Sequence, residues 1–258
     1  MRFNKLIIFT NFLCNLTSFA TSQDCNCKTT WEPTISPTTM YPTRSPTRSP
    51  TTMYPTRSPT RAPFVCEKPV DIGLILDRSG SIPGGGLIKE KKFSIDVLNS
   101  FRLGSEFAKF SIISFSSKVD GIVGFSDDRV NITTAINSIL PPRGSTFTGG
   151  AIKYFTDNYA SQMRNDIQVI VIITDGKPTR TGNDRDPIKY TIQQVIDLKG
   201  KYLKLNIITI GVGNFDKDFL MKISSVRNNK SLMYNINSFS NLSEIIKDLV
   251  EDICYDET

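Results

Sequence analysis

The hydrophobic and polar positions divide the chain near residue 65. Beyond that point, short apolar runs alternate with segments in which apolar residues recur every three or four positions. The runs are typical of buried strands, and the spaced positions are typical of helices with one apolar face. Strands that alternate with helices imply a mainly parallel sheet covered on both faces. The sequence therefore predicts a doubly wound, Rossmann-like α/β domain over residues 65–258.

The expected strands are short and apolar, and the run 168–174 (QVIVIIT) has the character of a central parallel strand. They lie at Val70–Leu76, Lys109–Ser116, Gly121–Phe125, Gln168–Thr174 and Asn206–Val212, with Met233–Ile236 as an edge strand. The expected helices each carry an apolar face. They cover Pro83–Phe101, Asp128–Leu140, Gly149–Asn158, Pro187–Lys199, Lys217–Ser224 and Ser240–Ile253.

The first 20 residues have the layout of a secretory signal peptide. Arg2 and Lys5 precede an apolar stretch, Leu6–Ala20, and small residues follow it. The stretch is shorter than the roughly 20 apolar residues that a spanning helix needs. We expect cleavage near Ala20 and a secreted chain without a membrane span. A signal retained as an anchor is the alternative.

A short cysteine-containing segment, 21–32, and a proline-rich segment, 33–64, follow the signal. Residues 38–50 (TTMYPTRSPTRSP) are repeated at 51–63 with one change. Proline at this density excludes helix and internal sheet, and serine and threonine beside proline are typical of an O-glycosylated stalk. The four arginines of the repeats keep such a spacer soluble and extended, and the alternative is that they bind an acidic polysaccharide.

The cysteines agree with export, because removal of the signal leaves an even number: Cys25, Cys27, Cys66 and Cys254. Three pairings are formally open. Cys66 and Cys254 bracket the domain, and a bridge between them would add roughly 5 kcal/mol of stability in the chain-entropy model. Cys25 and Cys27 are too close to bridge comfortably, so they are candidates for interchain bridges and self-association.

In an exported protein, three Asn-x-Ser/Thr sequences in the domain are candidate sites of N-glycosylation. Their acceptor residues are Asn131, Asn229 and Asn241, and we expect one or two of them to carry a glycan.

Charge and composition exclude several functions. The whole chain carries +6, but residues 65–258 hold 24 basic and 23 acidic side chains, a balance of +1. A nucleic-acid-binding surface is not expected on so neutral a domain. Histidine is absent, which removes Ser-His-Asp and Cys-His catalysis and histidine-ligated zinc.

Three loops that join strands and helices of the expected fold collect oxygen donors. They are Asp77-Arg78-Ser79-Gly80-Ser81, Gly144-Ser145-Thr146-Phe147-Thr148-Gly149 and Thr174-Asp175-Gly176. Ligands of open α/β sheets bind at the carboxyl ends of strands where the strand order reverses. If the strands before Asp77 and Asp175 are neighbours there, the two acids face each other. Carboxylates and hydroxyls favour Mg²⁺, Mn²⁺ or Ca²⁺ over zinc or copper.

The D-x-S-x-S loop, the T-x-T-G segment and the strand ending T-D-G, in this order, resemble a von Willebrand factor type A domain. The resemblance covers about residues 66–258. It implies a metal-ion-dependent adhesion site formed by Asp77, Ser79, Ser81, Thr146 and Asp175, with Thr148 as the alternative to Thr146. It further implies Mg²⁺ with one coordination position open for an acidic side chain of a protein partner.

Other interpretations of the same residues stay open. Ser81 could cap the helix that follows Pro83, and Arg78 could neutralise Asp77 without a metal. Arg143 and Phe147 are candidates for shaping partner specificity.

The function expected is that of a secreted, non-enzymatic adhesion or extracellular-matrix protein with no catalytic residues and no organic cofactor. The alternatives are a disulfide-linked wall or coat component and, more remotely, a cation-dependent hydrolase. Nucleotide binding is not expected, because neither glycine-rich stretch completes a phosphate-binding motif.

Overall fold

The computed structural model describes residues 65–164, 166–179 and 186–254. The expected signal, the segment with Cys25 and Cys27, and the proline-rich stalk lie outside the described residues and stay predictions.

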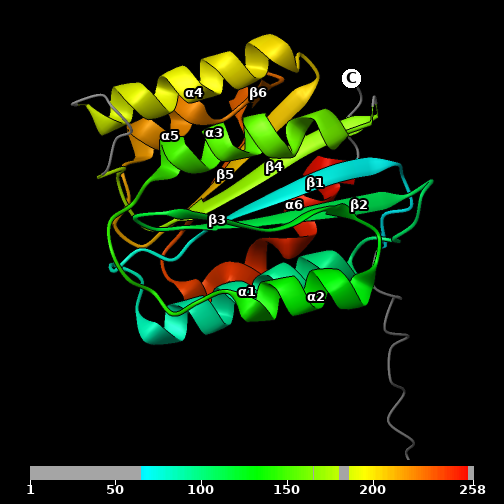
Figure 1. The fold of residues 1–258 in the computed structure, drawn as a ribbon, viewed down its shortest axis with the longest axis horizontal. Coiled ribbons are helices and arrows are strands. Elements are labelled where there is room, and N and C mark those ends of the chain that lie inside the picture. The colour runs from blue at the N-terminus through cyan, green and yellow to red at the C-terminus, as the bar shows by residue number, and fades with distance from the viewer. Residues whose placement is uncertain (1–64, 165, 180–185, 255–258) are drawn as a thin grey trace, which may run out of the picture. The chain divides into compact units, whose positions relative to one another are not determined.

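A six-stranded sheet forms the centre of the domain (Figure 1), in the order β3-β2-β1-β4-β5-β8. All neighbouring strands are parallel except β2 and β3, which are antiparallel. The strands are β1 (Val70–Asp77), β2 (Ala108–Phe115), β3 (Val119–Ser126), β4 (Ile167–Thr174), β5 (Leu205–Val212) and β8 (Met233–Ile236). The predicted fold class is therefore confirmed, and β8 is the edge strand that the sequence indicated.

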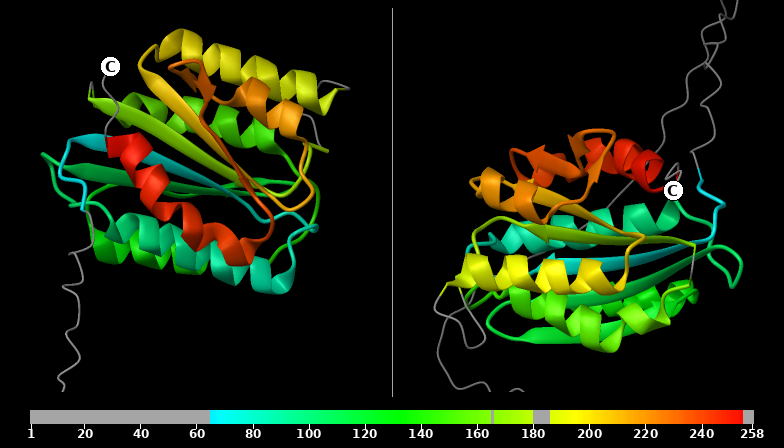
Figure 2. Two further views of the ribbon diagram at one scale, coloured as in Figure 1. Left: turned by 180° about the vertical axis from the view of Figure 1, so that it is seen from behind. Right: turned by 90° about the horizontal axis from the view of Figure 1, so that it is seen from above.

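Helices cover both faces of the sheet (Figures 1 and 2). One face carries α1 (Gly84–Asn99), α2 (Arg129–Ser138) and α6 (Ile246–Cys254), and the other carries α3 (Thr148–Asn158), α4 (Pro187–Lys201) and α5 (Lys217–Ile223). Alternate residues of each central strand point to the two faces, so two apolar cores form. Of the helices described, none is long and apolar enough to cross a bilayer.

The strand order places the reversal point between β1 and β4. These strands are parallel neighbours from Val70↔Ile167 to Leu76↔Ile173. The chain leaves β1 toward α1 on one face and leaves β4 toward α4 on the other. The loops that follow Asp77 and Thr174 therefore diverge around a shared crevice, where such folds bind ligands.

The structure differs from the sequence-based assignment in several places. The second helix begins at Arg129, because the Asp128 side chain accepts hydrogen bonds from the Val130 and Asn131 amides and so caps it. The expected helix Ser240–Ile253 is divided into a 3₁₀ helix, Phe239–Ile245, and α6. A hairpin of β6 (Val226–Arg227) and β7 (Lys230–Ser231) was not expected, and its turn holds Asn228 and Asn229 at positive φ. A second short 3₁₀ helix, Ala160–Gln162, follows α3.

Cys66 and Cys254 form a disulfide, with Cα atoms 5.9 Å apart. Both side chains are buried, and both belong to the core under α1, α2 and α6. The bridge joins the segment before β1 to the end of α6, 188 residues later.

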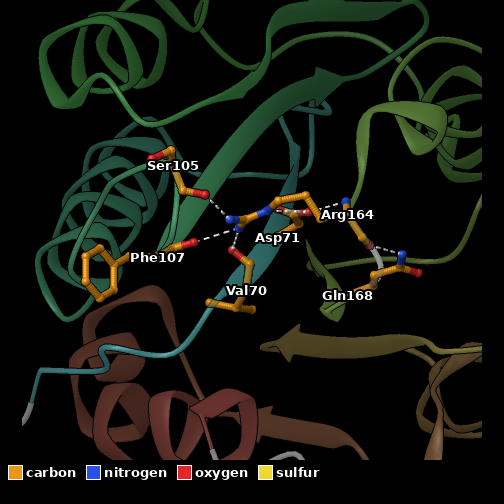
Figure 3. Close-up of polar contacts among 6 residues, drawn as sticks. All are labelled: Val70, Asp71, Ser105, Phe107, Arg164 and Gln168. Carbon is orange, nitrogen blue, oxygen red and sulfur yellow. Dashed lines mark hydrogen bonds and ion pairs between the residues drawn. The ribbon is translucent and has the colours of Figure 1, made fainter.

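A buried ion pair joins strands at the amino end of the sheet (Figure 3). Asp71 in β1 is 1% exposed, and its carboxylate accepts hydrogen bonds from the Arg164 guanidinium, including one of 2.7 Å. The same guanidinium donates to the carbonyl oxygens of Ser105 and Phe107, each at 2.6 Å. Arg164 thus links the segment before β4 to β1 and to the segment before β2.

Replacement of Asp71 by asparagine is expected to destabilise the domain by about 3–5 kcal/mol, because it leaves a partly buried guanidinium without its counter-charge. Urea unfolding of the full chain measures the change. Asp157→Asn is the matched control, since Asp157 pairs with Lys153 on the exposed side of α3 and contributes under about 1 kcal/mol. Equal midpoints for the two variants would contradict this role of Asp71.

Candidate metal centre

The three oxygen-rich loops meet at the reversal point between β1 and β4. Hydrogen bonds join the first loop to the other two, and they join the second loop to the segment that follows the third. The Gly80 amide donates to the Gly144 carbonyl oxygen at 2.9 Å, and the Ser81 hydroxyl donates to Asp175 Oδ1 at 2.8 Å. Thr146 and Thr179 exchange two bonds of 2.9 Å, which join the second loop to the segment after β4.

Asp77 ends β1 and lies at the base of the centre. Its side chain is fully buried, and both carboxylate oxygens are held. The Ser79 amide donates to Oδ1 at 2.7 Å, and the Thr174 hydroxyl donates to Oδ2 at 2.6 Å. The carboxylate therefore has one fixed orientation at the end of the two neighbouring strands.

Burial decreases from Asp77 outward. Ser79 is buried, Asp175 is half-buried and Ser81 is exposed. The Ser79 and Ser81 hydroxyl oxygens lie 3.0 Å apart, so the hydroxyls and Asp175 form a continuous row of oxygens that leads from the interior to solvent. The centre is thus open on one side.

The second loop contributes two threonines, and both are buried beside the centre. Thr146 is 4% exposed and is fixed by Thr179. Thr148 begins α3, is fully buried, and its hydroxyl has no hydrogen-bond partner within the described part of the chain. The assignment of Thr146 as the ligand, with Thr148 as the alternative, stays a prediction.

Three carboxyl groups of raised pKa lie in or near the centre. Burial raises the pKa of the Asp77 carboxyl from 3.8 to about 6, although bonds from Thr174 and Ser79 lower it. Burial also raises the pKa of Asp175, which the Ser81 hydroxyl lowers. Burial, followed by the charges of Asp77 and Asp175, raises the pKa of Glu90 in α1 well above its usual range. Burial is the largest cause of the shift at each of the three residues, so ionisation of each carboxyl is less favourable in the protein interior than in water.

Glu90 is a residue that sequence reasoning missed. Its side chain is fully buried, and among the described residues neither carboxylate oxygen has a hydrogen-bond partner. The signal was present, because Glu90 lies three positions before Phe93 on the apolar face that Val97 continues. Thr174 was also assigned no role, although it stands directly before Asp175.

Both metal-free interpretations of the first loop are wrong. The buried Arg78 guanidinium forms its ion pair with Asp120 in β3, not with Asp77. Ser81 does not cap α1, because the residue before that helix is Pro83 and no side chain caps it. The Ser81 hydroxyl instead bonds Asp175.

The residues present fit a hard divalent cation. Neighbouring ligands of octahedral Mg²⁺ are separated by about 2.9 Å, since each lies about 2.05 Å from the ion. The bonded oxygen pairs Ser79–Ser81 and Ser81–Asp175 are 3.0 and 2.8 Å apart. No cluster of three His, Cys, Asp or Glu side chains suited to a metal occurs in the described ranges, so this fit depends on the hydroxyls.

A pocket of about 490 Å³ adjoins the exposed side of the centre. Ser81 and Asp175 form part of its wall, and Pro83, Val212 and Phe239 add apolar surface. The open side of the centre therefore faces a space large enough for a side chain of another molecule.

A comparison with models of protein families identifies the family of this domain. Residues 71–248 match the model of the von Willebrand factor type A domain. The chain belongs to this family. The match covers more than half of the chain and contains all three loops of the centre.

Relatives of the type A domain here include proteins of extracellular matrix. The collagen alpha-4(VI) chain of Mus musculus is 27% identical over 197 residues, which are 74% of this chain and 8% of the relative. Matrilin-1 of Bos taurus is 24% identical over 196 residues, which cover 72% of this chain and 34% of the relative. The chain thus spans a minor part of each relative's length.

Solved structures show the same fold. Proximal thread matrix protein 1 from the mussel byssus, in a structure with a zinc-occupied MIDAS motif, superimposes with a TM-score of 0.63 at 24% identity. The match covers 74% of this chain and 47% of that one.

Proposed function

We propose that this type A domain binds a divalent cation and, through it, an acidic side chain of an extracellular protein. Asp77, Ser79, Ser81, Thr146 and Asp175 would hold the cation, which supplies a coordination position for the partner's carboxylate. One observation carries the proposal. Buried Asp77 and half-buried Asp175 share a row of hydroxyls, and in the described part of the chain no lysine or arginine pairs with either acid.

The chain would act as a secreted, non-enzymatic adhesion or matrix protein. Matrix collagens and matrilin-1 among its relatives support this, as does the expected export signal. Both acids of the centre are committed to the cation, so neither is left as a general base for hydrolysis. Mg²⁺ is the proposed ion because the donors are hard oxygens, with Mn²⁺ and Ca²⁺ as alternatives. Zn²⁺ belongs in the test because the mussel protein's motif holds it.

Saturating Mg²⁺ is expected to raise the melting midpoint of the full chain by about 5–10 °C relative to metal-free protein. Binding at 100 times the dissociation constant adds about 2.7 kcal/mol, and each kcal/mol moves a domain of this size by about 2–4 °C. Calorimetry with Mg²⁺, Mn²⁺, Ca²⁺, Zn²⁺ or EDTA measures the shift. Identical midpoints at millimolar cation would contradict cation binding.

The alternative, a wall or coat component linked through Cys25 and Cys27, makes a different prediction. Its oligomers would survive EDTA and disappear on reduction, whereas attachment through the cation would be lost in EDTA. Non-reducing electrophoresis and a surface-attachment assay, each with and without EDTA, separate the two functions.

A further inference from the structure

A second hollow, of about 280 Å³, lies beside the candidate metal centre. It shares no lining residue with the pocket next to Asp175. Its wall contains three cations and no acid, and its residues come from the first loop, the β2–β3 turn and the second loop. They are Arg78, Ser116, Ser117, Lys118, Arg143 and Gly144. We refer to this space as the basic hollow.

The wall of the basic hollow is fixed by hydrogen bonds. The Arg143 amide donates to the Arg78 carbonyl oxygen at 2.8 Å, and the Ser145 amide donates to the Ser117 hydroxyl at 2.8 Å. Gly144 has φ +81°, and a Cβ there would lie 2.4 Å from Ser117 Oγ. The second loop therefore approaches the β2–β3 turn as closely as glycine permits. These contacts fix the backbone segments that carry the three basic side chains.

The charge of the basic hollow is only partly balanced. The Arg78 side chain is 4% exposed, and its one ion pair is with Asp120, which is 43% exposed. Nε and Nη1 of Arg78 have no hydrogen-bond partner among the described residues. Lys118 and Arg143 are exposed, and neither forms an ion pair with any residue that the structure describes. A buried guanidinium and two further cations therefore produce a local positive potential.

We propose that the basic hollow binds a second carboxylate of the same acidic peptide partner, next to the carboxylate that the cation takes. This inference rests on the proposed function. Arg78 lies between Asp77 and Ser79, and Gly144 lies two residues before Thr146, so the two subsites share both loops. Neighbouring residues of a peptide are about 3.8 Å apart, which lets acids a few positions apart reach both subsites.

The charges favour an acidic peptide over a sulfated polysaccharide. The hollow is small, and the domain as a whole carries a net charge of only +1. A sulfated chain presents many anions and is bound by extended basic surfaces. Two closely spaced subsites, one with a divalent cation and one with arginine and lysine, match two acidic side chains.

The first experiment tests the hollow without the metal. ¹⁵N-labelled full chain in EDTA is titrated with acetyl-glutamyl-methylamide at constant ionic strength. We expect saturable shifts of the Ser117, Lys118 and Gly144 amides, lost in Lys118→Glu/Arg143→Glu. They should persist in Lys201→Glu/Lys204→Glu, which makes the same charge change at exposed positions before β5. No saturable shift at these amides, or equal shifts in both double variants, would overturn the proposal.

The second experiment tests the pairing of the subsites. Short peptides with one aspartate, or with a second acid one to three positions later, are titrated in Mg²⁺. We expect the best two-acid peptide to bind at least tenfold more tightly than the one-acid peptide, and Lys118→Glu/Arg143→Glu to abolish that advantage. Equal affinities, or cation-independent binding of a sulfated oligosaccharide in place of the peptides, would overturn it. Mg²⁺-induced shifts at Ser145, Thr146 and Asp175 report separately on the proposed cation site.

Discussion

Replacement of Asp77 by asparagine is expected to abolish cation binding, with a loss of at least about 100-fold in Mg²⁺ affinity. Asp77 is the innermost acid, and its orientation is fixed by the Ser79 amide and the Thr174 hydroxyl. Asparagine keeps the shape but removes one of the two negative charges of the centre, and a carboxyl group must be ionised to bind a divalent cation. The 5–10 °C rise of the melting midpoint in Mg²⁺ should therefore disappear.

The metal-free form of this variant separates a lost ligand from a damaged fold. Burial raises the pKa of Asp77, so the interior disfavours its charge, and Asp77→Asn should melt within a few degrees of metal-free wild type. Asp157→Asn, on the exposed side of α3, serves as the control and should keep the full Mg²⁺ response. An Mg²⁺ response retained in Asp77→Asn would exclude Asp77 as a ligand.

The sequence predicts the fold well where burial is uniform. The strands β1, β4 and β5 are mostly apolar and buried on both faces, and the helices between them carry single apolar faces, so periodicity alone assigns their types. It does not predict the hairpin β6–β7, which has two residues in each strand and depends on Asn228 and Asn229 in the left-handed region. Such a short element leaves no periodic signal.

The candidate centre is predicted less completely. Motif order indicates the three loops, and parallel strand ends explain why they meet. The partners of single side chains depend on the register between distant strands, which no local pattern specifies. Arg78 is the example: its neighbour in sequence is Asp77, but β2–β3 pairing brings Asp120 to it. Glu90 is another, because only the packed structure places this helix residue near both acids.

Cation affinity is expected to fall about tenfold for each pH unit below pH 6. Without metal, the pKa of Asp77 is about 6 against 3.8 for an ordinary aspartate, so a cation must displace a proton throughout that range. The metal-free fold shows the opposite trend. A raised pKa favours the folded state below pH 3.8, and this contribution, roughly 3 kcal/mol, is lost as pH rises through 6.

The Mg²⁺-induced rise in melting midpoint should therefore be small at pH 4.5, increase steeply to pH 6 and change less above it. Melting of metal-free and Mg²⁺-loaded full chain from pH 4.5 to 7.5 measures this directly. Glu90→Gln is the matched control, because it removes the other buried carboxyl of raised pKa and leaves Asp77 in place. Its Mg²⁺ response should increase with pH as that of wild type does. A response of equal size at pH 5 and pH 7 would show that cation binding does not require the ionised Asp77 carboxylate, and the assignment of Asp77 as a ligand would then be wrong.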